Sequence, residues 1–177
     1  KTFQDKKPEF ETEVPVKNTL AETIAPFTSL ASISDAKRLI KKGSIIFHFD
    51  GKVDNDAHTN PESLQIDDDK FLESTLKFDD NLNHSCSPNC YIDWDKLNLI
   101  SLKDIHKGEE LSFNYNTAEY DLVSLIEDCS FKCNCGARNC IKEVKGFRYL
   151  SQIQKRRILR LISPFLKKKF KQELENK

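Results

Sequence analysis

Hydrophobic and polar residues alternate along the chain in short segments separated by turns, a pattern typical of β-strands. Such segments cover residues 44–49, 63–66 and 111–115, and a run of apolar and hydroxyl residues covers 26–33. A longer alternating segment over 91–103 predicts a hairpin with its turn near Asp95 and Lys96. The pattern therefore predicts a mainly β fold of small antiparallel sheets.

Two of these strands follow the same kind of turn. The sequence Ile-Lys-Lys-Gly at 40–43 precedes one strand, and Ile-His-Lys-Gly at 105–108 precedes another. Each glycine, Gly43 and Gly108, supplies a turn conformation that a side chain would penalise. We expect the same turn-and-strand unit to be used twice.

The spacing of apolar residues changes to a helical period after residue 150. Ser151 and Gln154 form a capping box, and Ser163 followed by Pro164 caps and starts a second helix. The apolar residues at helical intervals are Ile153, Leu159, Leu161, Ile162, Phe165, Leu166, Phe170 and Leu174. The C-terminal part is therefore predicted to be helical.

Charge is balanced over the whole chain but not along it. Its 177 residues suit one domain with a core that needs no disulfides, and 28 Lys and Arg offset 28 Asp and Glu. Residues 151–177 hold nine basic residues and two glutamates, a net charge of +7. We expect this basic face, like the acidic run 67–69, to be solvated surface, with docking of acidic protein or nucleic acid as the alternative.

Several classes of protein are excluded by composition. The five glycines all lie more than three residues apart, so the chain has no G-x-G-x-x-G or Walker loop and is neither a Rossmann-type enzyme nor a P-loop nucleotidase. With no 18-residue apolar run and no charged-then-apolar leader, no membrane span or secretion signal is expected. Because the sequence contains no methionine, we expect the natural start to be missing.

The cysteines indicate a metal site. They stand at positions 86, 90, 129, 133, 135 and 140, and this clustering favours metal binding and a reducing compartment, the cytoplasm or the nucleus. The C-x-C-x4-C spacing of Cys133, Cys135 and Cys140 turns three sulfurs toward one centre, and tetrahedral zinc needs a fourth ligand. By spacing alone, the nearby Cys129 and the distant Cys86 are both candidates.

Three motifs in this order resemble the SET-domain protein-lysine methyltransferases with a zinc-binding post-SET motif. They read NHSCSPNC at 83–90, GEELSFNY at 108–115 and CNCGARNC at 133–140. The resemblance runs from about Ile40 to Cys140. The chain is similar to a small stand-alone SET protein. It implies small antiparallel sheets, a pseudoknot that threads the first two motifs, and short helices. The implied division is an N-terminal arm (1–23), a SET domain (24–121), a post-SET zinc segment (122–147) and a basic helical tail (148–177).

The resemblance also implies an activity and a site. The enzyme would transfer the methyl of S-adenosylmethionine to a lysine of a protein or peptide substrate, with Tyr115 as the catalytic residue that orients the amine. Asn83, His84 and Tyr115 would bind the cofactor. Phe113 and Phe49 would line the substrate channel, and phenylalanine at position 113 leaves room for more than one methyl. Structural zinc would be held by Cys86, Cys133, Cys135 and Cys140, with Cys86 in preference to Cys129.

The chemistry of methyl transfer fits residues of this kind. The enzyme must align donor and acceptor and admit the amine unprotonated, which an apolar channel beside a sulfonium favours. If residues 111–115 are one strand, Phe113 and Tyr115 share a face with Cα atoms about 7 Å apart, which suits the wall of an aromatic channel. The alternative interpretation is that Phe113 and Tyr115 are core residues of a half-buried strand and have no role in a site.

One departure from the family keeps a second function open. The family's Gly-x-Gly strand is replaced at about Ala31 to Ile33 by residues without glycine, which affects the methionine end of the cofactor pocket. The alternative function is a catalytically silent SET-like scaffold that binds protein or nucleic acid through the basic tail. A zinc ribbon that binds nucleic acid is a third. We assume a monomer, and no membrane partner is predicted.

Overall fold

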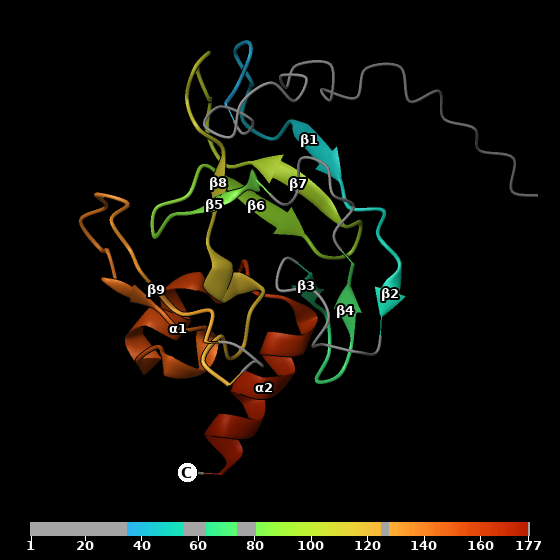
Figure 1. Cartoon of the computed structure of the whole chain (residues 1–177), viewed down its shortest axis with the longest axis vertical. Coiled ribbons are helices and arrows are strands. Elements are labelled where there is room, and N and C mark those ends of the chain that lie inside the picture. The colour runs from blue at the N-terminus through green and yellow to red at the C-terminus, as the bar shows by residue number, and fades with distance from the viewer. Residues whose placement is uncertain (1–34, 55–62, 74–80, 125–127, 177) are drawn as a thin grey trace, which may run out of the picture.

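The computed structural model describes residues 35–54, 63–73, 81–124 and 128–176. In this part of the chain the strands form small sheets in the orders β1-β7-β6, β2-β4-β3, β5-β8 and β10-β9 (Figure 1). The strands are β1 Ile45–His48, β2 Val53–Asp54, β3 Leu64–Gln65, β4 Phe71–Leu72, β5 Asn83–His84, β6 Cys90–Asp93, β7 Asn98–Ser101, β8 Ser112–Phe113, β9 Phe131–Lys132 and β10 Glu143–Val144. The predicted mainly β architecture of small sheets is confirmed. The arm 1–23, the strand expected over 26–33 and the replaced glycine strand at 31–33 lie outside the described residues.

The predicted hairpin, together with β1, forms one of the two three-stranded sheets of the described residues. β6 and β7 pair antiparallel from Cys90 opposite Ser101 to Asp93 opposite Asn98, and β1 pairs with the other edge of β7. The β-branched and aliphatic side chains of these strands make the main core together with the rings of Phe49 and Phe113. Burial of alternate residues along β6 explains why the alternating pattern was a good guide here.

The repeated turn unit pairs with itself. Ile40 and Ile105 form an antiparallel bridge in which each backbone N–H donates to the other carbonyl at 2.8 Å. Gly43 and Gly108 follow with φ of 82° and 84°, the left-handed conformation that glycine adopts without penalty. The echo in the sequence is therefore a local pseudo-twofold arrangement.

The C-terminal segment adds the helices. Helix α1 (Gln152–Ile158) begins at the capping box of Ser151 with Gln154, and α2 (Pro164–Glu175) begins at Ser163, whose side chain accepts the Leu166 N–H. Both predicted helix starts are confirmed. With the 3-10 helix η4 (Phe147–Tyr149) they enclose a second core of Phe147, Ile162, Phe165, Leu166 and Phe170. Within the described ranges, no helix has the length and apolar character needed to cross a membrane.

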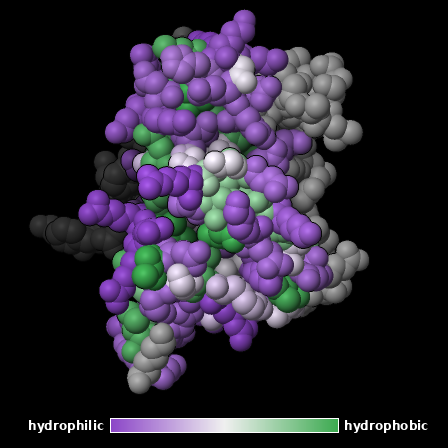
Figure 2. All heavy atoms as spheres, turned by 90° about the vertical axis from the view of Figure 1, so that its left-hand side faces the viewer, coloured by the Kyte–Doolittle hydropathy of each residue, from purple (hydrophilic) through white to green (hydrophobic). Residues whose placement is uncertain are grey.

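The sequence suggested that the acidic run 67–69 is solvated surface, but in the structure two of its carboxylates pair with the basic tail. Lys168 of α2 lies 3.5 Å from the carboxylate of Asp67, and Lys169 pairs with Asp68. The Lys169 ammonium also lies 5.2 Å from the centre of the Tyr120 ring. The basic tail therefore folds back onto the turn between β3 and β4, because opposite charges on the two segments attract. The face in Figure 2 is mostly hydrophilic, with its hydrophobic residues interspersed among polar ones.

Candidate functional site

Parallel pairing of β5 with β8 brings the first two motifs together. Asn83 lies opposite Ser112 and His84 opposite Phe113, and the Ser85 N–H donates to the Phe113 carbonyl at 3.0 Å. Parallel strands need a long connection, so this pairing is a tertiary feature that a local pattern cannot show. It places the segment 83–90 directly against the segment that carries the aromatic residues.

The buried side chain of Asn89 stabilises the contact between the segments 83–90 and 108–115 through hydrogen bonds. Its amide nitrogen donates to the Glu110 carbonyl at 2.8 Å, and its oxygen accepts the Ser112 N–H at 2.9 Å. The side chain is almost fully buried, so these bonds replace those that water would otherwise supply. Sequence reasoning gave Asn89 no role, although a polar residue inside the motif at 83–90 was a signal for one.

Tyr115 does not belong to the strand that was predicted over 111–115. Strand β8 ends at Phe113, and Tyr115 begins the 3-10 helix η3 (Tyr115–Thr117). The cause is Asn114, whose side chain accepts the Asn116 N–H and so caps a helical turn in place of extended backbone. The rings of Phe113 and Tyr115 nevertheless lie side by side, with centroids 4.9 Å apart.

The Tyr115 hydroxyl is held in place as a hydrogen-bond donor. It donates to the Leu82 carbonyl at 2.6 Å. Burial raises the pKa of Tyr115 to about 12, and the carboxylates of Glu119 and Glu110 act in the same direction. The phenol therefore stays protonated at neutral pH and does not act as a base.

His84 is a neutral ring with two defined partners. Burial lowers the pKa of His84 to about 4. Its Nδ1 accepts the backbone N–H of Tyr115 at 3.1 Å, and its Nε2 lies 3.3 Å from the Cys86 sulfur. This predicted cofactor residue thus also joins the tyrosine to the cysteine cluster.

A cavity of about 500 Å³ opens beside these residues. It is lined by the predicted Asn83, His84 and Tyr115, and also by Glu110, Phe131 and Lys132. Phe131 of β9 was not predicted: its ring centroid lies 5.8 Å from that of Tyr115, and 37% of its surface is exposed. Its position two residues before Cys133 was the only available signal.

The two proposed channel residues are core residues in this structure. Phe113 and Phe49 are both buried in the main core cluster, and neither lines the 500 Å³ cavity. Phe113 reaches the site through its contact with the Tyr115 ring, whereas the ring of Phe49 packs against Phe47 at 5.2 Å. Their role in a substrate channel stays a prediction.

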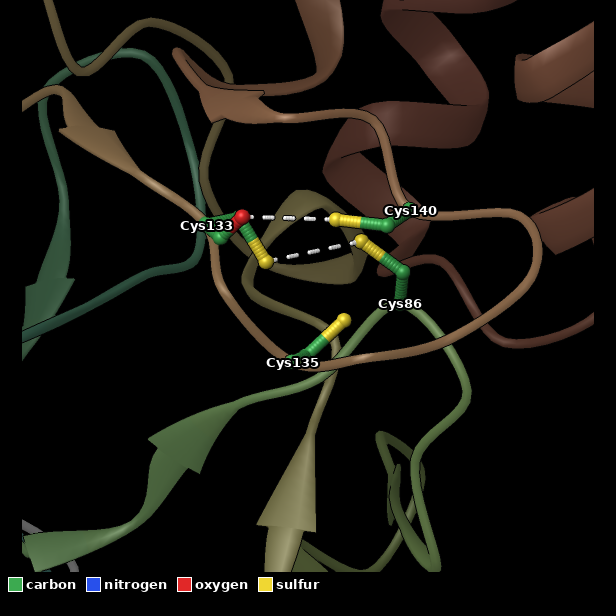
Figure 3. Close-up of side chains that lie close together, drawn as sticks. All are labelled: Cys86, Cys133, Cys135 and Cys140. Carbon is green, nitrogen blue, oxygen red and sulfur yellow. Dashed lines mark hydrogen bonds between the residues drawn. The ribbon is translucent and has the colours of Figure 1, made fainter.

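The four predicted metal ligands come together. The sulfurs of Cys86, Cys133, Cys135 and Cys140 all lie within 4.8 Å of one another and point toward a common centre (Figure 3). Cys86 follows β5, and the other three occupy the loop between β9 and β10. Cys129 packs beside this cluster without belonging to it. The long-range choice of Cys86 over Cys129 is therefore the one that the geometry supports.

The cluster fits structural zinc. The sulfurs of Cys86 and Cys133 are 3.8 Å apart. Four sulfurs at a Zn–S distance of about 2.3 Å in a tetrahedron are separated by about 3.8 Å. Burial raises the pKa of the Cys86 thiol to about 12, so a thiolate there needs a positive charge, which a divalent cation supplies.

Comparison with known proteins agrees with this geometry. Residues 35–116 match the family model described as SET domain. Proteins described as histone-lysine N-methyltransferase, H3 lysine-36 specific, from Debaryomyces hansenii and Gibberella zeae are each 30% identical over 128 residues, or 60% of this chain. The match covers 17% and 13% of their lengths, so the chain spans less than a fifth of these relatives.

A solved structure agrees as well. KRYPTONITE in complex with mCHG DNA and SAH superposes with a TM-score of 0.50 and 26% sequence identity. The match covers 62% of this chain and 26% of that one. The described sheets, the motifs at 83–90 and 108–115 and these comparisons lead to one assignment: residues 35–116 of this chain are a SET domain.

Proposed function

We propose that the chain is a protein-lysine N-methyltransferase that uses S-adenosylmethionine. The relatives named above are described as histone-lysine N-methyltransferases. The observation that carries the proposal is that the adjacent Asn83 and His84 and the distant Tyr115 line one cavity next to the four-cysteine cluster.

The cofactor would occupy this cavity. Its volume of about 500 Å³ is that of a small-molecule site. The partly exposed Phe131 ring is suited to packing against a purine, and the Lys132 ammonium to an acidic group at the rim. The related KRYPTONITE structure contains SAH, which remains when S-adenosylmethionine has given up its methyl group.

Tyr115 would orient the reacting amine. In the transfer, the lone pair of an unprotonated lysine Nζ forms the bond to the methyl carbon, and the bond from that carbon to sulfur breaks with its electrons left on sulfur. The protonated phenol is fixed by its bond to the Leu82 carbonyl, so its oxygen lone pairs remain available to accept from the amine. Such positioning supplies much of the rate in a displacement that needs no strong base.

Phe113 and Phe49 would set the apolar wall beside the amine. Phe113 contacts Tyr115, and both phenylalanines belong to one core cluster. A ring without a hydroxyl at position 113 leaves room for a methylated amine, so we propose that more than one methyl is added. Histone H3 is the first substrate to test, in view of the relatives' description, and it would place the protein in the nucleus.

The structural division follows the same proposal. The SET domain would extend over 24–121, a zinc-holding post-SET segment over 122–147 and the helical tail over 148–177. Zinc at the four cysteines would tie the loop between β9 and β10 to β5 and so keep Phe131 at the cavity. Binding of the cofactor would then depend on zinc.

The scaffold alternative loses part of its support. Lys155, Lys168 and Lys169 of the basic tail are paired within the chain, with Glu173, Asp67 and Asp68 respectively. The Lys155 ammonium is almost fully buried and lies 4.9 Å from the centre of the Phe147 ring. These three of the nine basic residues of the tail are therefore paired within the chain, and one of them, Lys155, is buried away from any external partner.

Calorimetry of the zinc-loaded protein with S-adenosylmethionine tests the proposal first. We expect a micromolar Kd, about 8 kcal/mol of binding free energy. Transfer of labelled methyl to histone H3 is then compared between wild type, Tyr115→Phe and Tyr149→Phe. Tyr149 serves as the matched control because its hydroxyl is bonded to Asp121, away from the cavity. Absence of cofactor binding with zinc intact would reject the enzyme and leave the scaffold.

A further inference from the structure

The side chain of His84 connects the cysteine cluster with Tyr115. Its two nitrogens face different partners, the Cys86 sulfur at 3.3 Å and the Tyr115 backbone nitrogen at 3.1 Å. The imidazole also packs edge-on against the Tyr115 ring, with centroids 5.4 Å apart and an interplanar angle of 78°. A single side chain therefore touches both a metal ligand and the proposed catalytic residue.

The hydrogen bonds define which nitrogen carries the proton. A backbone N–H can only donate, so Nδ1 of His84 accepts from Tyr115 and is unprotonated. The proton of the neutral ring is then on Nε2, which donates to the sulfur of Cys86. This donor-to-thiolate contact is the kind of outer contact that orients a metal ligand.

The hydrogen bond from the Tyr115 N–H to His84 satisfies a backbone donor that has no partner within its own helix. Tyr115 is the first residue of η3, and the first N–H groups of a helical turn have no partner within it. His84 supplies the acceptor for this N–H and so holds the first residue of η3, the turn that Asn114 caps. The hydroxyl of Tyr115 is fixed separately by the Leu82 carbonyl, so the residue is held at both ends.

We propose that His84 is a positioning residue that couples metal binding at the four cysteines to the placement of the Tyr115 backbone. When the Cys86 sulfur is a metal-bound thiolate, it accepts from Nε2 and holds the ring so that Nδ1 faces Tyr115. Without the metal the ring loses this constraint and the Tyr115 N–H loses its fixed partner. The coupling rests on the proposed function only in taking Tyr115 as the catalytic residue.

Two isosteric substitutions separate the two bonds. The side-chain oxygen of asparagine can take the place of Nδ1, so His84→Asn keeps an acceptor for Tyr115 and loses the donor to Cys86. The side-chain amide of glutamine reaches as far as Nε2, so His84→Gln keeps the donor to Cys86 and loses the acceptor for Tyr115. Each variant is thus the matched control of the other.

Zinc affinity and amide exchange measure the two bonds without any assay of activity. By chelator competition, we expect His84→Asn to weaken zinc binding by about 10- to 100-fold and His84→Gln to change it little. By hydrogen exchange in NMR spectra, we expect the Tyr115 amide to exchange up to about tenfold faster in His84→Gln and nearly as in wild type in His84→Asn. Equal effects of the two variants on both quantities would overturn the proposal.

Measurements on the wild type keep the test valid if a variant does not fold. The nitrogen shifts of the His84 ring should report a proton on Nε2, and a proton on Nδ1 would overturn the proposal. Removal of zinc should accelerate exchange at Tyr115 more than at Tyr91 of β6, which lies in the main sheet. Equal acceleration at both would also overturn it.

Kinetics distinguish this coupling from the proposed function itself. At saturating zinc and S-adenosylmethionine, we expect His84→Gln to lower kcat more than His84→Asn does, because only His84→Gln removes the acceptor that places the Tyr115 backbone. A wild-type protein that shows no methyl transfer would reject the proposed function. Its zinc affinity and its Tyr115 amide would still decide the role of His84.

Discussion

Replacement of Cys86 by serine tests the proposed link, through zinc at the four-cysteine cluster, between the loop from β9 to β10 and the SET domain. Cys86 follows β5, whereas its nearest partner in the cluster, Cys133, lies 47 residues further along the chain. The other two cysteines belong to the same loop as Cys133. Cys86→Ser therefore removes the only one of the four ligands that joins this loop to the rest of the domain.

The expected cost follows from chain entropy. If zinc stays on the thiols in the unfolded chain, a cross-link that closes 47 residues stabilises the fold by about 4 kcal/mol. For a protein of this size, that loss lowers Tm by about 8–16 °C. Cys129→Ser is the matched control, because Cys129 packs beside the cluster without belonging to it, and we expect a loss below about 1 kcal/mol.

Zinc content and thermal unfolding decide the outcome. Metal is quantified by release to a chromophoric chelator, and Tm is followed by circular dichroism at saturating zinc. We expect Cys86→Ser to bind zinc more weakly and to unfold at lower temperature, with Cys129→Ser close to wild type on both counts. The reverse pattern would refute the ligand set, and a Cys86→Ser protein with normal zinc and normal Tm would refute the cross-link.

Four further outcomes follow from the described contacts. Tyr115→Phe should lower the methyl-transfer rate by about 100-fold or more with zinc content unchanged, and a wild-type rate would reject its role. Phe113→Tyr should shift the products seen by mass spectrometry toward one methyl; an unchanged product distribution would count against a wall at this position. Glu173→Gln leaves the buried Lys155 ammonium unpaired and should lower the free energy of unfolding, measured in urea, by about 2 kcal/mol. Lys155→Met should leave the free energy of unfolding nearly unchanged. Equal losses in the two variants would contradict this reasoning. Burial raises the pKa of Glu119 to about 7, so the stability that its protonated form contributes is present at low pH and is lost as the pH rises through 7. Glu119→Gln should abolish this loss of stability. A Glu119→Gln protein with the wild-type pH profile of stability would disprove the reasoning.

Local chemistry in the sequence was enough for many of these features. Ser151 with Gln154 and Ser163 with Pro164 define helix starts through contacts within a few residues. Gly43 and Gly108 take left-handed turns for the same local reason. The C-x-C-x4-C spacing likewise sets three sulfurs around one turn, so these elements depend little on the remainder of the fold.

The sequence by itself therefore determined the mainly β class, the hairpin, the helix starts and the local grouping of the thiols of Cys133, Cys135 and Cys140. Only the tertiary structure decided that β5 pairs with β8, that Cys86 completes the cluster and that the basic tail pairs with residues 67–69. It also moved Tyr115 from a strand to a 3-10 helix and gave His84 two partners. The physical reason is that dihedral preferences and caps act over a few residues, whereas these contacts join segments tens of residues apart and exist only once the whole domain has closed.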